Sequence, residues 1–232
     1  MNPDRTIPHE WLHKRSRFFP PPELWPPVGP ILMTDTLPLE MVVDAYAHGL
    51  FPWPFGRRAR WIPWASPNPR SILEWNQFHV PRSLARTLRR GIFEIRCNTA
   101  FTDVMNACAM EHRGDDGKLG GDNDSWITPK MIRTYTRLHE IGLAHSIESW
   151  RDGRLVGGVY GVAIRRLFAA ESMFYREPDA SKVALVTLVE HLRARGFQLF
   201  DIQEITPNTR RFGAMEIPRS EYLRRLRLAV FG

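Results

Sequence analysis

Cysteine is scarce in this sequence, and a long apolar run is absent from it. Two cysteines, Cys97 and Cys108, occur among 232 residues, which is too few for a disulfide framework or a structural zinc site. No uncharged run approaches the ~20 residues of a membrane-spanning helix, and the opening MNPDRTIPHEWLHKR lacks the apolar core of a signal peptide. We therefore expect a cytoplasmic protein that works in a reducing compartment and does not contact a membrane.

Metal-ligand spacing is missing as well, since His, Cys, Asp and Glu do not recur in a ligand-like pattern. The loop HRGDDGKLGGDN at 112–123 is rich in Asp and Gly, but its acidic residues do not follow the calcium-loop pattern with its closing Glu. We expect a flexible insertion there, no metal, and no other cofactor.

Positive charge is what the sequence has in excess. Lys and Arg number 32 against 25 Asp and Glu, which gives a formal net charge of +7 and a sequence pI near 9.9. Most of the excess is arginine, whose planar guanidinium suits phosphate, so the composition favours an anionic partner, with nucleic acid first. A basic surface that is merely solvated would explain the composition equally well.

The arginines are densest in FHVPRSLARTLRRG at 78–91. Helical spacing would place four of them within about three turns: Arg82, Arg86, Arg89 and Arg90. This stretch is the best candidate for binding phosphates, although a charge run of this kind is more often a solvated helix face.

A β, β, α, β order is predicted between Leu155 and Gln203. Residues 155–162 alternate apolar and small side chains around three glycines, and 166–170 read as an antiparallel partner strand. Ser181 suits the N-cap of the helix that follows, and Gly196 suits its end. Residues 197–202 then form the last strand. Glycines in the first strand would let another backbone or a ligand approach closely.

Polar side chains end two of these predicted strands, and such positions beside a helix are the usual place for a site in an α/β domain. Glu171 ends the second strand, and Asp201 and Gln203 end the last one. Because side chains two apart on a strand point the same way, Asp201 and Gln203 should share a face. These three residues are the first candidates for catalysis, with a buried structural carboxylate as the alternative for Glu171.

The segments before this stretch contain helices and an aromatic loop. A helix is expected over 38–48, and the loop from 49 to 70 carries three tryptophans, two phenylalanines and five prolines. A loop this apolar should form either a pocket wall or an inter-domain seam. Another helix should begin at Thr128 and Pro129 and end at Gly142. His145 lies in the strand after it, where a hydrogen-bonded core histidine is the usual finding.

Six strings in this order resemble the leucyl/phenylalanyl-tRNA-protein transferase family. They are GLFPWP (49–54), SWITPKMI (125–132), AHSIESW (144–150), FAAESMFYREPDASKVAL (168–185), FDIQ (200–203) and GAMEIPRSEYL (213–223). The resemblance covers nearly everything from Asp35 to Leu226. It implies an α/β (α+β) fold, with a small N-terminal α/β domain at 1–66 and a larger N-acetyltransferase-like domain at 67–232.

The resemblance also implies an activity. Members move leucine or phenylalanine from aminoacyl-tRNA to the N-terminal Arg or Lys of acceptor proteins, which marks those proteins for N-end-rule degradation. Methionine is expected as a third donor, and the protein is expected to act as a monomer. Aminolysis of an ester requires alignment, a neutral amine and help for the developing oxyanion rather than a metal or a covalent nucleophile.

Residue roles follow from the same resemblance. Asp201 and Gln203 would form a relay in which Gln203 orients the incoming amine, while Asp201 fixes the amide and favours proton loss. A mainly positional role is the alternative for this pair. Glu171 would offer its carboxylate to the cationic side chain of the acceptor. Four aromatic residues match positions that seat the aminoacyl-tRNA end, although core packing is the ordinary reading of the last two: Tyr46, Trp53, Trp126 and Tyr135.

The donor pocket should be apolar, because leucine and phenylalanine share little except size and hydrophobicity. Phe168, Met173 and Phe200 lie near the right strand ends, although such residues are more often plain core. The sequence departs from the family where a histidine usual after the D-x-Q is Asn208, and where Arg210 and Arg211 are unusual. These departures bear on donor and acceptor preference more than on the reaction.

Two other functions fit parts of the sequence. An acyl-coenzyme-A-dependent N-acetyltransferase would need a glycine-rich pyrophosphate loop that enters a helix, and the nearest string, at 154–159, lacks its last glycine and lies in a predicted strand. A non-catalytic tRNA-binding protein would need only the basic run and the aromatics, and the intact Glu171, Asp201 and Gln203 argue against it.

Overall fold

The computed structural model describes residues 1–55, 58–111 and 125–232. The strands are β1 (Leu32–Thr34), β2 (Phe51–Pro52), β3 (Ile62–Ala65), β4 (Arg70–Leu73), β5 (Glu94–Cys97), β6 (Ala144–Arg151), β7 (Arg154–Ile164), β8 (Leu167–Tyr175), β9 (Leu199–Gln203) and β10 (Ala214–Ile217). The helices are α1 (Leu39–Ala47), α2 (Arg82–Arg90), α3 (Phe101–Glu111), α4 (Pro129–Glu140), α5 (Ala180–Ala194), α6 (Pro207–Arg210) and α7 (Arg219–Phe231), and the short 3-10 turns are η1 (His9–Trp11) and η2 (Pro22–Leu24). The insertion expected at 112–123, with its calcium alternative, lies outside the described residues.

A large mixed sheet organises the molecule. In the described residues its seven strands run in the order β10-β4-β9-β8-β7-β6-β5. Only the β8–β9 pair among them is parallel, because α5 carries the chain back across the sheet between these two strands. The α+β class expected from the sequence is therefore confirmed.

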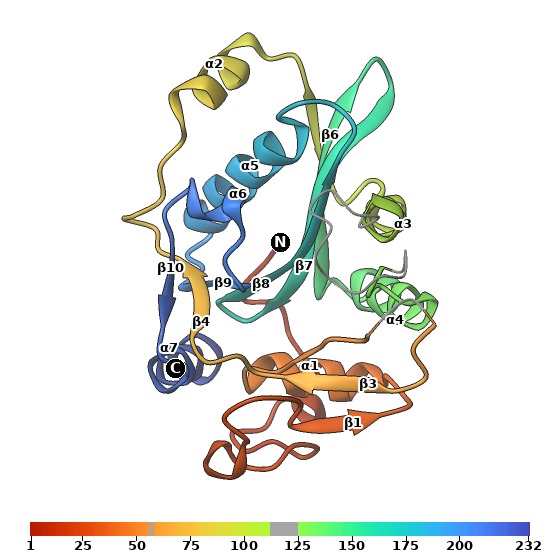
Figure 1. Ribbon diagram of the computed structural model, residues 1–232, viewed down its shortest axis with the longest axis vertical. Coiled ribbons are helices and arrows are strands. Elements are labelled where there is room, and N and C mark those ends of the chain that lie inside the picture. The colour runs from red at the N-terminus through yellow and green to blue at the C-terminus, as the bar shows by residue number, and fades with distance from the viewer. Residues whose placement is uncertain (56–57, 112–124) are drawn as a thin grey trace.

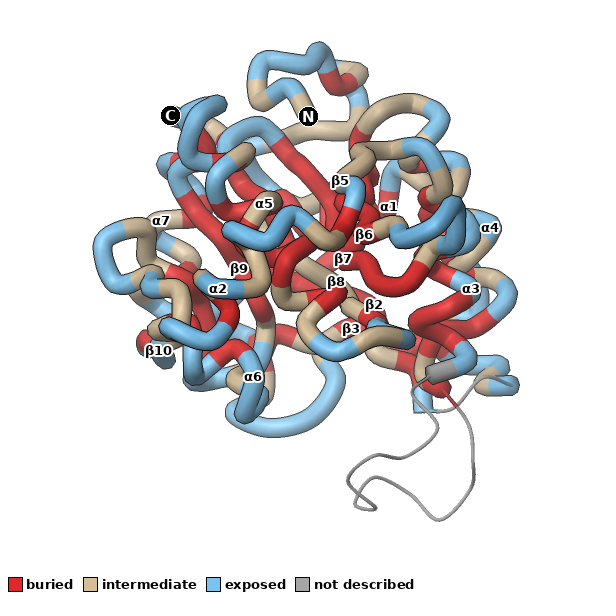
Figure 2. The backbone as a smooth tube through the Cα atoms, turned by 90° about the horizontal axis from the view of Figure 1, so that it is seen from above, coloured by how far each residue is buried: buried red, intermediate tan, exposed pale blue. Residues whose placement is uncertain are grey.

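Helices cover both faces of this sheet, which gives three layers (Figure 1). Helix α5 packs on β6, β7 and β8 from one side, and α2 packs on α5. Helices α1, α3, α4 and α7 contact the strands from the other side. Figure 2 shows buried residues following the central strands and the inward sides of these helices. Each face of the sheet therefore has its own hydrophobic cluster.

The predicted β, β, α, β order is confirmed by β7, β8, α5 and β9, with β7 and β8 antiparallel. Gly157 allows the close approach expected of a strand glycine, since a Cβ there would lie 2.5 Å from the Cβ of Ala180. The N-cap prediction was wrong, because α5 begins at Ala180 after Asp179 and Ser181 is buried inside the helix. Tight packing of the first helical turn on Gly157 sets this start, rather than a capping side chain.

Helix ends with strong local signals were predicted correctly. Thr128 is the N-cap of α4 and accepts a hydrogen bond from the Met131 N–H, with Pro129 in the first turn. Gly142 and Gly196 adopt left-handed backbone angles just beyond α4 and α5. His145 is buried and its Nδ1 lies 3.0 Å from Asn98 Nδ2, which confirms a hydrogen-bonded core histidine.

The N-terminal part forms a small sheet of its own. Within residues 1–66 the structure places β1, β2 and β3 in the order β1-β3-β2. Trp64 on β3 is fully buried, and its indole N–H donates to Thr34 Oγ1. One hydrophobic cluster includes side chains from this part and from the large sheet. The domain boundary at residue 66 stays a prediction, because this cluster contains buried side chains from both sides of it.

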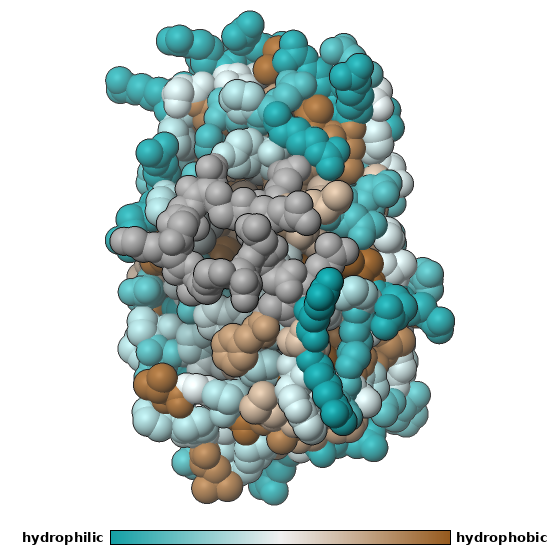
Figure 3. Space-filling view, turned by 45° about the vertical axis from the view of Figure 1, so that its right-hand side comes forward, coloured by the Kyte–Doolittle hydropathy of each residue, from teal (hydrophilic) through white to brown (hydrophobic). Residues whose placement is uncertain are grey.

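Hydrophobic side chains are scattered on the surface that Figure 3 shows, between larger areas of hydrophilic ones. Among the described residues, the exposed large apolar side chains include Phe55 and Trp61 in the aromatic loop. Trp64 from the same loop is fully buried in a hydrophobic cluster instead. None of the described helices is both long enough and apolar enough to cross a membrane.

Candidate active site

Two β-bulges place the candidate catalytic residues at one point of the sheet. Glu171 is the extra residue of β8, since Ser172 pairs with Tyr160 and Ala170 pairs with Gly161. In β9 the pairing with β4 passes from Asp201 directly to Gln203. Bulges bend a strand and re-aim side chains, and they are common beside active sites. Gln203 completes the bend with a left-handed φ of 62°.

Glu171 and Gln203 meet because β8 and β9 run parallel. Ala169 is in register with Asp201, so the residues two positions further along each strand lie side by side. Gln203 Nε2 donates to Glu171 Oε1 over 2.6 Å. This contact fixes the amide plane and leaves the Gln203 carbonyl oxygen available as an acceptor. The partner of the Gln203 amide is thus Glu171, and not Asp201 as the sequence led us to expect.

Asp201 belongs to a separate buried network. Its carboxylate accepts two hydrogen bonds from Arg70, from Nε over 2.9 Å and from Nη2 over 2.5 Å, and one from the Tyr222 hydroxyl over 2.7 Å. Asp201 is 0% exposed and Arg70 is 1% exposed. Burial alone would lower the pKa of Arg70, but the Asp201 carboxylate raises it above its ordinary value. Arg70 therefore keeps its positive charge inside the protein, in contact with Asp201.

This network corrects the role expected for the Asp201 side chain. It was expected to hold the side-chain amide of Gln203, but Asp201 Oδ1 accepts from the backbone N–H of Gln203 instead, over 2.9 Å. The other hydrogen bonds to this carboxylate come from Arg70 and Tyr222. Asp201 thus holds the bulged end of β9 in place, and it reaches the Gln203 side chain only through the backbone.

Burial and neighbouring charges raise the pKa of Glu171. The pKa is about 8, mainly because burial disfavours the carboxylate, with the charge of Asp201 adding to the effect. Nearby Tyr46, the Arg70 guanidinium and the Gln203 amide act in the opposite direction. Glu171 Oε2 is enclosed and has no donor in good hydrogen-bonding geometry among the described residues. A cationic group placed there would lower the pKa and favour the ionised form.

Two tyrosines close the site on the side of α1 and α4. The hydroxyls of Tyr46 and Tyr135 lie 2.5 Å apart, and both side chains are at most 1% exposed. Burial, followed by the charge of Glu171, raises the pKa of each well above its usual range. Both therefore remain neutral phenols. Two of the residues expected to seat the aminoacyl-tRNA end therefore lie beside Glu171, one of the candidate catalytic residues.

The other aromatic residues predicted for the site are less closely joined to it. Trp53 and Trp126 are half-buried and pack against the hydrophobic cluster that contains Tyr46 and Tyr135. Trp53 also lies beside Phe51, whose ring is under the Arg70 guanidinium. These two tryptophans therefore line the same side of the sheet as Glu171.

The side chains expected to form the donor pocket lie on the opposite face. Phe168 and Phe200 are at most 1% exposed and pack in the cluster beneath α5, with Met173 against it. Side chains alternate along β8 and β9, so Phe168 and Phe200 lie on one face of the sheet, and Ala169 and Asp201 lie on the other. The structure does not bring these three together with Glu171, and they serve the core.

The arginine-rich stretch forms α2, an exposed helix. Leu84 is its only buried residue. In the described part of the chain, none of the four guanidiniums of Arg82, Arg86, Arg89 and Arg90 has an ion-pair partner. The helix lies on α5, at one end of the molecule in Figure 1. Four unpaired positive charges on one short helix are suited to phosphates.

Arg70 and Tyr222 are the functional residues that sequence reasoning missed. Arg70 stands alone before the short apolar run SIL, and a charged residue at that position usually faces solvent. Tyr222 falls within a string that carried the family resemblance, so a signal for it existed. Among the described residues, no group of three His, Cys, Asp or Glu side chains could hold a metal ion.

The mixed sheet and the buried carboxylate–amide pair on it define an α+β protein with a polar site at the centre of its sheet. The family model "Leucyl/phenylalanyl-tRNA protein transferase" matches residues 72–227. The chain belongs to this family.

Relatives with that name cover most of the chain. The protein of Thiobacillus denitrificans is 49% identical over 90% of this chain and 89% of its own length, and that of Anaeromyxobacter dehalogenans is 45% identical over 93% and 89%. The protein of Novosphingobium aromaticivorans is 49% identical over 82% of this chain and 70% of its own.

Solved structures are more distant. The C-terminal domain of a putative lysylphosphatidylglycerol synthetase from Agrobacterium fabrum matches with a TM-score of 0.37 and 13% identity, and L-PGS from Bacillus licheniformis with 0.37 and 10%. They are matched over 75% and 73% of this chain, which spans about half of each of them, 53% and 51%.

Proposed function

We propose that this protein transfers an aminoacyl group from tRNA to the N-terminus of an acceptor protein, with leucine, phenylalanine and methionine as donors and Arg or Lys as the acceptor's first residue. The α-amine nitrogen attacks the ester carbonyl, a C–N bond forms, and the ester C–O bond to the tRNA ribose breaks. The proton lost by the amine ends on the released ribose hydroxyl. The Glu171–Gln203 contact, next to neutral Tyr46 and Tyr135, is the observation that carries the proposal.

Gln203 orients the amine. Its Nε2 donates to Glu171, so its carbonyl oxygen is left to accept a hydrogen bond from the attacking N–H. Alignment of this kind is a large part of what aminolysis of an activated ester requires. Asp201 is a positioning residue, because it holds the backbone of Gln203 and is itself held by Arg70 and Tyr222.

Glu171 binds the cationic side chain of the acceptor. Its pKa of about 8 means that the free enzyme holds a largely neutral carboxyl at pH 7. An arginine or lysine side chain beside Oε2 would supply the missing partner and lower this pKa, so the acceptor's arrival would release a proton. A charge-assisted hydrogen bond of that type contributes about 1.5–3 kcal/mol. An acceptor that begins with a neutral residue would leave the site without this contribution.

The tRNA lies along the basic face of α2, and its aminoacyl end binds beside the half-buried Trp53 and Trp126, with the buried Tyr46 and Tyr135 next to Glu171. The two tyrosines are neutral donors close to Glu171 and suit the reacting end of the tRNA. The donor side chain then packs on the aromatic side of the sheet, away from Phe168 and Phe200. The protein acts as a monomer in the cytoplasm, and the residue that it adds marks the acceptor protein for N-end-rule degradation.

The test is transfer of labelled leucine from charged tRNA to peptides that begin with arginine, aspartate or alanine, beside an acetyl-coenzyme-A control. Transfer to the arginine peptide alone is expected. Transfer to the aspartate peptide would contradict the role of Glu171 while keeping the reaction. Tight tRNA binding without transfer would identify a non-catalytic binding protein, and acetylation would identify a coenzyme-A enzyme.

A further inference from the structure

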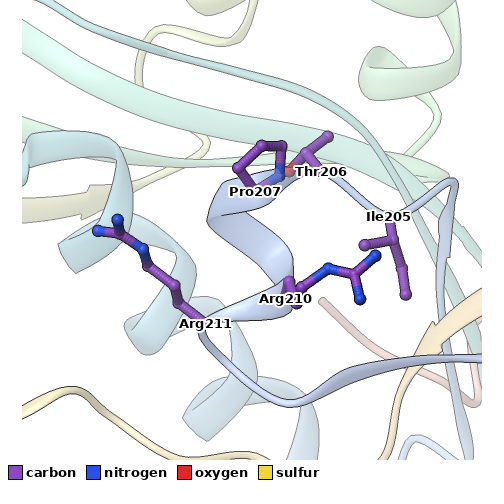
Figure 4. Close-up of a pocket in the computed structure, with 5 residues that line it drawn as sticks. All are labelled: Ile205, Thr206, Pro207, Arg210 and Arg211. Carbon is purple, nitrogen blue, oxygen red and sulfur yellow. The ribbon is translucent and has the colours of Figure 1, made fainter.

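A concave surface directly follows the catalytic strand. It has a volume of about 400 Å³ and is lined by Ile205, Thr206, Pro207, Arg210 and Arg211 (Figure 4). The first residue that lines it, Ile205, comes two positions after Gln203 along the chain. Its volume is within the range of small-molecule sites, ~300–1,000 Å³, and suits one or two nucleotide units.

Two unpaired cations form part of this concavity. Arg210 and Arg211 are exposed, and in residues 1–55, 58–111 and 125–232 neither guanidinium has a hydrogen-bond or ion-pair partner. Figure 4 shows the two side chains extending in opposite directions from the α6 turn. This arrangement suits two consecutive phosphates of a strand better than one phosphate held by both arginines. The other lining residues are uncharged.

The arginine turn is attached to the segment that leads into α2. The His79 N–H donates to the Phe212 carbonyl over 3.3 Å, and the rings of Phe78 and Phe212 stack with centroids 5.7 Å apart. A Cβ on Gly213 would lie 2.2 Å from the Gln77 carbonyl oxygen, so the two backbones are in close contact. The arginine turn is therefore packed directly against residues 77–79, which lie three to five positions before α2 begins.

We propose that Arg210 and Arg211 bind consecutive phosphates in the unpaired 3′ strand of the aminoacyl-tRNA. The inference rests on the proposed function and adds a second phosphate site to α2, close to Gln203. Attachment to the segment entering α2 favours tRNA over an acidic acceptor peptide. Every nucleotide carries a phosphate, whereas a peptide would need an acidic residue at one particular position.

The test compares two double variants that each remove two adjacent exposed arginines. Arg210→Gln with Arg211→Gln removes the proposed contacts. Arg165→Gln with Arg166→Gln is the matched control, because this pair lies in the β7–β8 turn, at the end of β8 where Leu167 pairs with Leu199 and away from Gln203. Circular dichroism and thermal unfolding establish that both variants fold.

The readout is the affinity for leucyl-tRNA between 50 and 200 mM salt. Single-stranded contacts contribute about 0.7 each to the slope of log affinity against log salt, so loss of two should reduce the slope by about 1.4. Over this fourfold range of salt, the wild type would lose about 7-fold more affinity than the Arg210/Arg211 variant. The control should keep the wild-type slope.

A tRNA shortened at its unpaired 3′ end localises the contact. It should bind the wild type and the Arg210/Arg211 variant with the same salt slope, because the phosphates in question are gone. An unchanged slope with full-length tRNA would overturn the inference, as would a higher KM for the acceptor peptide alone. Leucine transfer by the wild type is measured in parallel. If the proposed function is wrong, neither the wild type nor the variants will transfer leucine, whereas failure of the phosphate-binding inference alone leaves transfer by the wild type intact.

Discussion

Replacing Asp201 by asparagine should destabilise the fold more than it changes tRNA binding. The substitution keeps the side-chain size but removes the charge that two Arg70 nitrogens contact at 2.5 and 2.9 Å. Arg70 is 1% exposed, so its charge would remain buried without a counter-ion. Breaking a buried pair in this way costs about 3–5 kcal/mol.

The magnitude can be converted to a melting temperature. For a chain of 150–250 residues, 1 kcal/mol corresponds to about 2–4 °C, so the melting temperature should fall by about 6–20 °C. Thermal and urea unfolding at pH 7 measure it, and leucyl-tRNA affinity, measured well below the melting temperature, should stay near the wild-type value. Transfer should still fall, because the Gln203 backbone loses the acceptor at Oδ1.

A double-mutant cycle separates the ion pair from other effects. Arg70→Met combined with Asp201→Asn removes both charges, so the double variant should be less destabilised than the sum of the two single variants. Additive losses, or a loss below about 1 kcal/mol for Asp201→Asn, would refute the reasoning. Asp201 would then act mainly as a chemical group in catalysis rather than as the anchor of β9.

Three further predictions concern the same surfaces. Tyr222→Phe removes the hydroxyl that donates to Asp201 and should cost about 1.5–3 kcal/mol in urea unfolding, while a loss under about 0.5 kcal/mol would contradict it. The pKa of Glu171 is about 8 in the folded protein against an ordinary 4.5, so the folded state binds one more proton than the unfolded state between these pH values. The stability of the wild type should therefore fall relative to that of Glu171→Gln as pH rises from 5 to 8. Melting temperatures of the two proteins that change in parallel across that range would contradict this prediction. Arg86→Ala with Arg89→Ala should flatten the salt dependence of tRNA binding by about 0.9 per contact with kcat unchanged, and an equal fall in kcat would argue against phosphate binding.

Local signals predicted the elements that depend on local chemistry. The Thr128 cap, the glycines at 142 and 196, and the strand order around α5 follow from hydrogen bonds and backbone angles within a few residues. Ser181 failed as an N-cap because packing of Ala180 on Gly157 decided where α5 starts. Tertiary packing overrode the propensity of a single side chain there.

The candidate site was predictable in its residue types but not in its connections. Glu171 and Gln203 could be named because the sequence predicted that polar groups end their strands. Gln203 does end β9, but the prediction was wrong for Glu171, since β8 continues to Tyr175. Their direct contact depends on a bulge in each strand, and a bulge adds one residue without a clear sequence mark. Phe168 and Phe200 lie on the face beneath α5 through ordinary alternation, since each stands one residue before Ala169 or Asp201 in the paired part of β8 and β9.

The sequence by itself determined the β, β, α, β order, the basic helix and the three polar candidates Glu171, Asp201 and Gln203, because these depend on composition, periodicity and polar positions within short windows. Only the tertiary structure decided that Asp201 is held by Arg70, which is 131 positions away along the chain, and that Gln203 is held by Glu171. Such pairings depend on strand register and burial. Both are set by packing of distant segments, and no local pattern encodes them.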